Sequence, residues 1–335
     1  MIGYYVHHVG SGHLHRATAV AQALGEPVTG FSSLPAPADW PGPWIELEAD
    51  EVTDGGADPA GTTARERLHW VPLGHRGLRS RMAEIAAWLR HCEPTAFVVD
   101  VSVEVAVLVR LHGIPVVTVV LPGDRGDAAH RLGFDVSDAL VGCWPPAAAG
   151  MLRGVPAEVE ERVQAVGALS RFPVVDPAPR TPDGRRVLLL AGAGGHDISA
   201  EDVARAREDS PDWEWTVLDR ALGTWVADPW DALRGADVVV THAGQNALAA
   251  VAAARRPAVV LPQPRPHREQ ETTADVLARG CWPAVVVTEW PRDGWSQRLA
   301  GVAALDGAGW SGWCDGRAAD RVADVVRRTS LQEPS

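Results

Sequence analysis

The feature that most constrains this chain is a repeated pattern along its whole length. A short apolar run rich in Val is followed by a turn with Gly and then by an Ala-rich amphipathic stretch. Short β-branched runs are typical of buried strands in parallel sheets, and the stretches between them have helical periodicity. The pattern therefore predicts an α/β fold built on parallel sheets. A length of 335 residues predicts two domains.

Two series of strand and helix units are separated by a Pro-rich segment. The first series has expected strands at residues 2–6, 96–101 and 115–121 and helices at 16–24, 77–91 and 103–111. The second has strands at 187–191, 215–218, 238–241, 257–261 and 284–287, and helices that begin after Ser199 or span 247–254, 271–279 and 318–328.

The segment between these series reads RFPVVDPAPRTPDGRR, which is typical of a linker. We therefore predict a domain at 1–170, a linker at 171–186 and a second domain at 187–335. Two Rossmann-like domains of this kind bind ligands at the carboxyl ends of their strands, in the crevice between the domains.

Composition excludes several classes of protein. Thirty-one basic residues, all Arg, stand against 43 acidic residues, and a net charge of −12 disfavours a general nucleic-acid-binding surface. The four cysteines are far apart and lack metal-type spacing, which indicates reduced thiols in a cytoplasmic protein. No apolar run is long enough for a transmembrane segment, so we expect at most peripheral membrane contact.

A glycine-rich turn follows the first expected strand and opens a helix, with the sequence Gly10, Ser11, Gly12, His13. It is not a dinucleotide fingerprint, because His15 stands where the third Gly belongs, and this disfavours a dehydrogenase. A neutral imidazole at His13 can take a proton from a substrate hydroxyl. A purely structural role for a histidine in such a turn is the alternative.

The neighbouring histidines also allow a metal site to be considered. His7 and His8 are adjacent on an expected strand and therefore point to opposite faces, and no carboxylate joins them locally. We therefore predict no metal site.

A second glycine turn, with Gly194 and Gly195, follows the strand expected at 187–191. Its backbone amides are suited to holding a phosphate ahead of the next helix. Such turns serve packing in α/β proteins about as often, so this signal is weak by itself.

The most informative segment follows the strand expected at 238–241. His242, Gly244, Gln245 and Asn246 occupy the strand end and the first turn of a helix, where backbone amides and side-chain donors together make an anion site. One strand–helix unit later, Glu269 and Gln270 open another helix. A carboxylate and an amide there can bind the hydroxyls of a sugar. Ordinary capping and packing roles are the alternative.

These segments, in this order, resemble those of the two-Rossmann (GT-B) glycosyltransferases. The chain resembles in particular the family of the bacterial N-acetylglucosaminyltransferase that makes lipid II, with its glycosyltransferase family 28 type of C-terminal donor domain. The stretch THAGQNALAAVAAARRPAVVLPQPRPHREQ also resembles the signature of plant glycosyltransferases. The likeness covers nearly the whole chain and is most specific in this stretch.

The resemblance implies a role for each matching residue. The donor pyrophosphate would be held by the motif at 242–246 and by backbone amides of the second glycine turn, the donor sugar by the pair at 269–270, and a uracil by Val226. These implied donor-binding residues are Gly194, Gly195, Val226, His242, Gly244, Gln245, Asn246, Glu269 and Gln270.

One position departs from the family. The family places a Glu six residues after the glycine of the motif to bind both ribose hydroxyls, and this chain has Ala250 there. The identity of the nucleotide is therefore open, although a uridine diphosphate (UDP) sugar is the first expectation.

The expected reaction is inverting transfer of a sugar from a nucleotide-diphosphate donor to an acceptor hydroxyl. His13 is the expected base, with Gly10, Ser11 and Gly12 forming an acceptor-side loop. Asp100, at the end of the strand at 96–101, is expected to orient His13, to contact the acceptor or to replace His13 as the base, or else simply to cap the next helix. No Asp-x-Asp pair occurs, so we expect transfer without a metal or other cofactor.

Two other functions remain open at this stage. A UDP-sugar 2-epimerase of the same fold would need no acceptor. A non-catalytic protein that binds nucleotide sugars would agree with the Ala250 departure.

Overall fold

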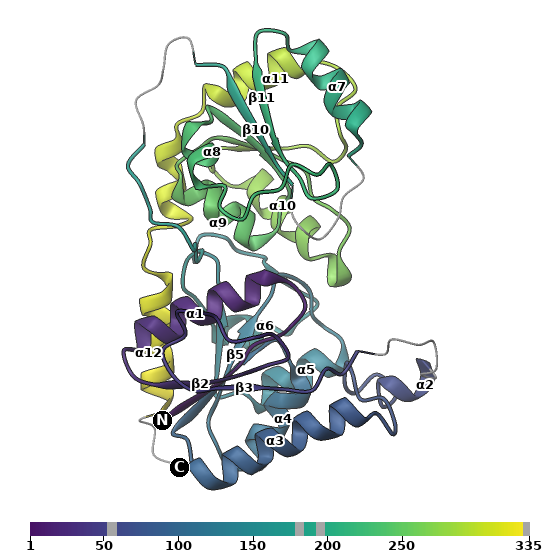
Figure 1. The fold of residues 1–335 in the computed structure, drawn as a ribbon, viewed down its shortest axis with the longest axis vertical. Coiled ribbons are helices and arrows are strands. Elements are labelled where there is room, and N and C mark those ends of the chain that lie inside the picture. Colours follow the sequence, from purple (N-terminus) through teal and green to yellow (C-terminus); the bar gives the residue numbers. More distant parts are fainter. Residues whose placement is uncertain (52–58, 178–183, 192–197, 331–335) are drawn as a thin grey trace. The chain divides into compact units, whose positions relative to one another are not determined.

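The computed structural model describes residues 1–51, 59–177, 184–191 and 198–330. The chain forms two compact units. The first comprises Met1–Cys143, Leu152–Val166 and the chain from Ala319 onward, and the second comprises Trp144–Met151 and Gly167–Ala318. Figure 1 shows a parallel sheet with helices on both faces in each unit. The predicted α/β class with two parallel sheets is confirmed.

The first unit is built on a seven-stranded sheet in which every neighbouring pair is parallel. In spatial order the strands are β3 (Trp44–Glu46), β2 (Val28–Ser32), β1 (Ile2–Tyr5), β4 (Ala96–Asp100), β5 (Val116–Val120), β7 (Ala139–Gly142) and β9 (Val163–Ala165). Ile2 at the start of β1 pairs with Val28 on one side and Ala96 on the other.

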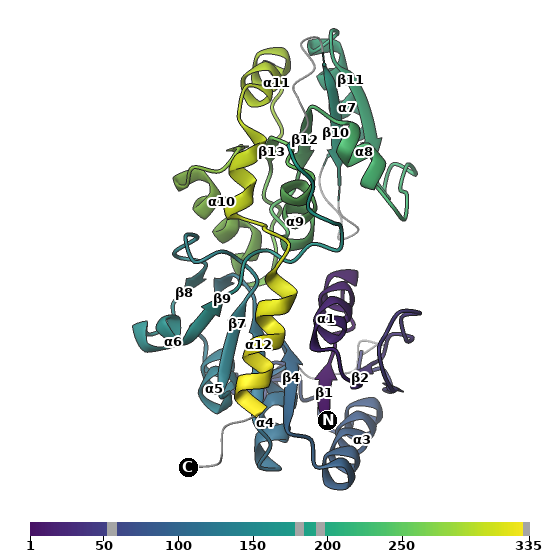
Figure 2. The same cartoon turned by 90° about the vertical axis from the view of Figure 1, so that its left-hand side faces the viewer.

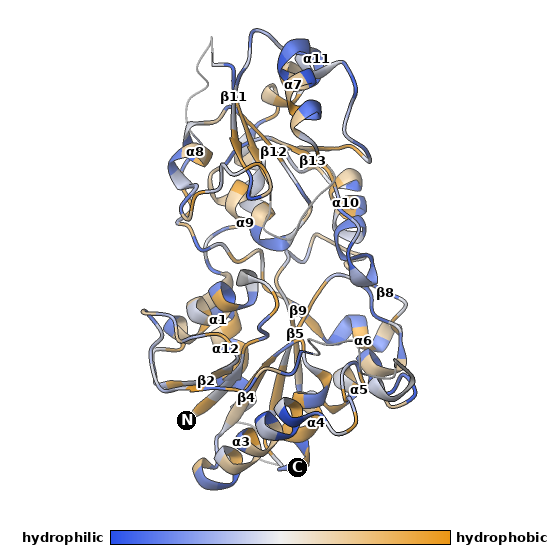
Figure 3. Ribbon diagram, turned by 45° about the vertical axis from the view of Figure 1, so that its right-hand side comes forward, coloured by the Kyte–Doolittle hydropathy of each residue, from blue (hydrophilic) through white to orange (hydrophobic). Residues whose placement is uncertain are grey.

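Helices cover both faces of this sheet. In Figures 1 and 3, α3, α4 and α5 lie on one face, and α1 and α12 lie on the other. The core under α3 and α4 contains Tyr5, Phe31, Ile85, Phe97 and Val105, each at most 3% exposed. The helices are α1 (Ser11–Leu24), α2 (Pro59–Thr62), α3 (Arg76–Cys92), α4 (Val103–Leu111), α5 (Ala128–Val136), α6 (Ala157–Arg162) and α12 (Ala318–Ser330), and a short pair joins β6 (Gly123–Asp124) to β8 (Leu152–Arg153).

The second unit has a five-stranded sheet that is also parallel throughout. Its strands, in spatial order, are β11 (Glu214–Leu218), β10 (Arg186–Leu190), β12 (Val238–Thr241), β13 (Ala258–Val260) and β14 (Ala284–Val286). Its helices are α7 (Ala200–Asp209), α8 (Trp230–Gly235), α9 (Gln245–Ala253), α10 (Glu269–Arg279) and α11 (Trp295–Ala303), with 3₁₀ turns η1 (Pro266–Arg268) and η2 (Gly307–Gly312).

Local sequence explains how these elements begin. Ser199 and Asp202 form the capping box at the start of α7, with the Ser199 hydroxyl accepting the Asp202 N–H at 3.1 Å. The strands of both sheets are coloured toward the hydrophobic end of the scale in Figure 3, in keeping with burial on both faces. In the second unit, Trp215 and Trp295 pack edge to face at 5.2 Å within the core.

The C-terminal helix departs from the predicted domain boundaries. Residues 187–335 were expected to form one domain, but α12 packs on the first unit, between β9 and α1 (Figures 1 and 2). Its apolar stripe, including Val322 and Val326, is fully buried. Arg327 Nη2 donates to the carbonyls of Ala23 and Leu24 at the end of α1, and Arg328 Nη2 donates to Gln164 Oε1 of β9.

Two further differences concern the chain between the units. Residues 144–151 lie with the second unit, and so does the described part of the expected linker at 171–186.

Among the residues that the structure describes, no helix combines the length and the apolar character needed to cross a membrane. The four cysteines, Cys92, Cys143, Cys281 and Cys314, are free thiols in the structure.

Candidate active site

The structure brings His13 and Asp100 together at the carboxyl end of the first sheet. His13 lies in the first turn of α1, and Asp100 is the last residue of β4, the strand next to β1. His13 Nδ1 and Asp100 Oδ1 are 3.0 Å apart. The His13 side chain is 15% exposed and that of Asp100 is fully buried. A histidine held by a buried carboxylate in this way has one ring nitrogen available for proton transfer.

A third residue, Arg16, completes this cluster. One turn after His13 on α1, its Nη2 donates to Asp100 Oδ1 at 2.7 Å and its Nε donates to Asp100 Oδ2 at 3.3 Å. Burial by itself raises the pKa of Asp100, but the Arg16 guanidinium and His13 outweigh it and hold that pKa well below its usual range. Asp100 is therefore a carboxylate at all ordinary pH values. Arg16 belongs to no motif that marks it as a site residue in the sequence.

The turn after β4 shows what Asp100 does not do. Ser102 caps α4, with its hydroxyl accepting the Val105 N–H at 3.3 Å, so Asp100 is not the helix cap that was one alternative. Val101 between them has a φ of 65°. Left-handed backbone is unusual for a β-branched residue and costs of order 1–3 kcal/mol. Such strain is typical of functional sites, where the surrounding fold holds it in place.

His7 and His8 follow β1 instead of lying on it, and their rings stack beside His13 instead of pointing to opposite faces as predicted. Their ring centroids are 5.1 Å apart, and the ring of His7 is 5.3 Å from that of His13. His7 Nδ1 accepts the Val9 N–H at 3.1 Å. Burial, together with the neighbouring His13 and His8, lowers the pKa of His7 to about 4, so this ring is neutral near pH 7. No group of three potential ligands among the described residues includes His7, His8 or His15.

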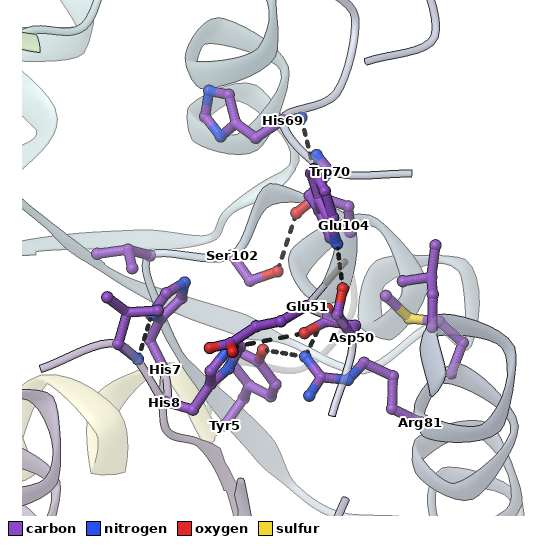
Figure 4. Close-up of a pocket in the computed structure, with 14 residues that line it drawn as sticks. Tyr5, His7, His8, Asp50, Glu51, His69, Trp70, Arg81, Ser102 and Glu104 are labelled. Carbon is purple, nitrogen blue, oxygen red and sulfur yellow. Dashed lines mark hydrogen bonds and ion pairs between the residues drawn. The ribbon is translucent and has the colours of Figure 1, made fainter. Parts of the chain in front are cut away.

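A cavity of about 330 Å³ opens next to this cluster, within the first unit (Figure 4). Its size suits a small molecule. His7 and Val101 connect it to His13 and Asp100, and Trp70, Leu78 and Met82 supply apolar surface. Trp70 lies in the loop before α3, and Leu78 and Met82 lie on the apolar face of α3; no sequence motif marks any of them as a site residue.

Buried polar contacts fix the wall of this cavity. Arg81, 1% exposed, donates to Tyr5 Oη at 3.1 Å and to Asp50 Oδ2 at 2.7 Å. Glu104 Oε1 accepts the backbone N–H groups of His69 and Trp70 at 2.7 and 2.9 Å, as Figure 4 shows. These contacts hold the loop at 69–70 against α4 and keep the cavity in shape.

In the second unit, the predicted donor motif lies where β12 meets α9. Gly244 is the residue before the helix, and the amides of its first turn lack partners within the helix. His242 Nδ1 accepts the Gly244 N–H at 3.0 Å, so a neutral His242 carries its ring proton on Nε2 as a donor. Gln245 and Asn246 are the first two residues of α9. Donors gathered at a helix N-terminus suit a phosphate.

Gln270 holds this motif in place. Its side chain is buried, and Oε1 accepts the N–H of Ala243 at 3.2 Å and that of Gln263 at 2.9 Å. One amide therefore ties together the strand-end loops of β12 and β13. The contact of Gln270 with a donor sugar stays a prediction. Glu269, half-buried, begins α10 beside it, after His267 and Arg268 with left-handed φ values of 56° and 55°.

The remaining donor-side predictions are placed as follows. Val226 is 40% exposed in the segment between β11 and α8. Gly194 and Gly195 lie outside the described residues. Ala250 is 6% exposed within α9, and that helix contains no acidic residue to replace the ribose carboxylate of the family. In the first unit, Gly10 precedes α1 with a φ of 93°, and Ser11 and Gly12 begin the helix.

Comparison with known proteins adds to this picture. No protein-family model and no curated protein matches the sequence. Solved structures match it along its whole length. The glycosyltransferase of kitacinnamycin has a TM-score of 0.70 at 18% identity, and the match covers 98% of both chains. MurG of Acinetobacter baumannii has a TM-score of 0.62 at 15% identity, covering 98% of this chain and 99% of that one.

The chain has the GT-B fold. A third structure of this fold is the spinosyn rhamnosyltransferase SpnG complexed with thymidine diphosphate, with a TM-score of 0.59 at 17% identity over 98% of this chain and 96% of that one. In the GT-B fold described here, the His13–Asp100 pair belongs to the first unit and the motif at 242–246 to the second.

Proposed function

We propose that this protein is an inverting glycosyltransferase that moves a sugar from a nucleotide-diphosphate donor to an acceptor hydroxyl. The observation that carries the proposal is the pairing of His13 with the buried Asp100 beside a cavity of about 330 Å³. The likeness of the whole chain to solved glycosyltransferases supports it.

His13 acts as the general base. When its Nδ1–H donates to Asp100, Nε2 has a lone pair and accepts the proton of the acceptor hydroxyl. The acceptor oxygen attacks the anomeric carbon on the face opposite the leaving diphosphate, which inverts the configuration. The negative charge of Asp100 stabilises the imidazolium that forms. The acceptor occupies the cavity next to this pair.

The second unit binds the donor. Negative charge develops on the diphosphate as the bond to the sugar breaks, and the amides at the start of α9 stabilise it. His242 Nε2–H and Asn246 supply further donors to the phosphates. Glu269 binds the sugar hydroxyls, and Gln270 maintains the loop geometry that this arrangement requires.

The donor nucleotide is UDP in this proposal, with thymidine diphosphate as the alternative. The SpnG structure contains thymidine diphosphate. Helix α9 has no carboxylate, which agrees with a nucleotide whose ribose does not hydrogen-bond to a carboxylate of this helix through its 2′-hydroxyl. Calorimetry with UDP and with thymidine diphosphate separates the two alternatives. If thymidine diphosphate binds at least as tightly as UDP, the donor is a thymidine-diphosphate sugar.

Transfer needs no metal in this proposal, because the sequence has no Asp-x-Asp pair and helix N-termini with His242 meet the phosphate charge. We expect unchanged turnover in the presence of a chelator. A chelator-sensitive activity restored by Mg²⁺ or Mn²⁺ would contradict this part of the proposal.

The test of the function is incubation of the protein with nucleotide sugars, first alone and then with a panel of hydroxyl acceptors, followed by mass spectrometry. A product heavier than the acceptor by one glycosyl residue supports transfer. A changed sugar epimer without acceptor would identify a 2-epimerase instead. Donor binding with no product from any acceptor would indicate a binding protein.

A further inference from the structure

The described lining of the acceptor cavity carries more negative than positive charge. Three carboxylates, those of Asp50, Glu51 and Glu104, face a single guanidinium, that of Arg81. The other ionisable groups in the lining are Tyr5, His7, His8 and His69. Figure 4 shows the carboxylates and Arg81 within one close-up.

The guanidinium of Arg81 already donates hydrogen bonds to protein groups. Arg81 donates to Asp50, to Tyr5 and to the carbonyl of Glu48, and it is 1% exposed. An anionic ligand would have to break these buried contacts to reach it. The side chain of Glu51, by contrast, is 63% exposed, with Oε1 3.4 Å from His8 Nε2. Its negative charge therefore faces a ligand that enters the cavity.

We propose that the acceptor is an uncharged or cationic hydroxyl compound with an apolar face, an inference that rests on the proposed function. The apolar face lies on Trp70, Leu78 and Met82. Acceptors with a phosphate or carboxylate close to the reacting hydroxyl are excluded, because the carboxylates repel them and the one cation is neutralised within the wall.

Three phenols of similar size but different charge test this: tyramine, the neutral 4-(2-hydroxyethyl)phenol and 4-hydroxyphenylacetate. Their binding is measured by calorimetry without any donor, so the ranking does not depend on sugar transfer. We expect tyramine to bind about tenfold or more tighter than 4-hydroxyphenylacetate, because the like charges repel at short range. In Glu51→Gln the ratio of the two dissociation constants, for 4-hydroxyphenylacetate over tyramine, becomes smaller. The control Glu84→Gln, an exposed change of the same charge on α3, leaves it unchanged.

Tighter binding of 4-hydroxyphenylacetate, or the same ratio in Glu51→Gln as in the parent, would overturn the assignment of acceptor class. Binding of none of the three would overturn it too, since the cavity would then not take an apolar-faced hydroxyl compound of this size. Sugar transfer to anionic acceptors would leave the proposed function standing while refuting this inference.

A separate observation concerns the ring of His13. Its Nδ1 lies 3.0 Å from Asp100 Oδ1 and 2.9 Å from Arg16 Nη2. A carboxylate accepts a hydrogen bond from this nitrogen, whereas a guanidinium donates one to it. The two contacts therefore require different tautomers of the neutral ring. With Nδ1–H, the ring donates to Asp100 and Nε2 is free to act as a base. With Nε2–H, Nδ1 accepts from Arg16 and the ring cannot act as a base.

We infer that Arg16 is a positioning residue that sets the balance between these tautomers of His13. It competes with Asp100 for Nδ1, and it also neutralises the carboxylate through its contacts with both Oδ atoms. The fraction of the enzyme that is ready for transfer is the fraction with Nδ1–H.

The tautomers are read by two-bond ¹H–¹⁵N correlation spectra of the full chain labelled with ¹⁵N-histidine, with His13→Gln to assign the signals. The neutral His13 of the parent should show a measurable Nε2–H fraction. Arg16→Lys keeps the positive charge but loses the planar guanidinium that reaches both Asp100 and His13. We therefore expect the ratio of Nδ1–H to Nε2–H tautomers of His13 to rise by about fivefold, the equivalent of about 1 kcal/mol for one hydrogen bond. The exposed Arg90→Lys on α3 is the matched control.

In the same variant, kcat should rise while the KM for the acceptor stays constant, an effect that a purely structural role of Arg16 would not produce. A neutral His13 that is wholly Nδ1–H in the parent would overturn the inference, and this result needs no variant to fold. An unchanged ratio in Arg16→Lys would overturn it as well. Because the spectra are recorded without substrates, loss of the proposed function would not alter them.

Discussion

Burial determines which groups hold protons in the first unit. His130 is 8% exposed, with Nδ1 against Asp127 and Nε2 against Arg125 Nη1 at 3.0 Å. Burial lowers the pKa of His130 to about 4, although Asp127 opposes the shift. His7 is lowered to about 4 as well, chiefly by burial. Both rings are neutral in the folded protein at pH 5 to 7, where an unfolded histidine takes up a proton.

Stability should therefore fall as the pH is lowered from 6.5 toward 4. The folded pKa of each ring lies below the unfolded value, so the unfolded chain binds the extra protons and the stabilisation present above pH 6.5 is lost in this window. Each ring accounts for a loss of about 2 kcal/mol by pH 5. Urea unfolding at pH 7.5 and pH 5 measures the difference. His130→Gln should shrink it, while the exposed His112→Gln should not.

The same loss between the two pH values in His130→Gln as in the parent would show that His130 is protonated in the folded state. Asp100 adds nothing in this window, because its depressed pKa places its own contribution at a lower pH, where it is lost below about pH 4.

At this scale, motifs point to some residues of the proposed site and not to others. His13 was predicted from its glycine-rich turn, and Asp100 from its position at a strand end. Arg16 and Arg81 were missed because a buried guanidinium looks in sequence like any helical Arg, and its value depends on a carboxylate 84 or 31 residues away. Only the folded chain brings these partners together.

At the scale of elements, the residues of the proposed site lie mainly in short turns after parallel strands. The turn between β12 and α9 has three residues, and a Cβ atom at Gly244 would lie 2.6 Å from the His242 ring, so any other residue there displaces that ring. The sequence predicted this turn because a buried Val run and a glycine mark its limits. It did not predict β2, β3, β7 and β9, which are short or flanked by Pro and Trp rather than by a Gly turn.

Gly244→Ala should weaken donor binding with little loss of stability. The added methyl group displaces the His242 ring and disturbs its contact with the Gly244 N–H, which costs about 1–3 kcal/mol of affinity if one hydrogen bond to a phosphate is lost. The matched control is Gly235→Ala at the end of α8, where a Cβ meets nothing within 4 Å. Calorimetry with UDP compares the two variants. Equal affinities would remove His242 from the donor site.

At the scale of the whole molecule, the chain forms two units, and the proposal assigns a different part of the chemistry to each. The sequence predicted two parallel sheets, with only part of the first one, and it assigned α12 to the second unit. The reason is physical, since the amphipathic pattern of residues 318–328 shows that one face is buried but not on which sheet. The contacts of Arg327 with α1 and of Arg328 with β9 settle this in the structure.

The division of labour between the two units is the central claim, and paired variants test it most directly. UDP affinity and turnover are measured for His13→Ala and for Asn246→Ala. We expect His13→Ala to lower turnover by about 10² to 10⁴, the usual contribution of a positioned base, with UDP affinity unchanged. Asn246→Ala should weaken UDP binding by about 1–3 kcal/mol. Parental turnover in His13→Ala at saturating acceptor, or an equal loss of UDP affinity in both variants, would contradict the account.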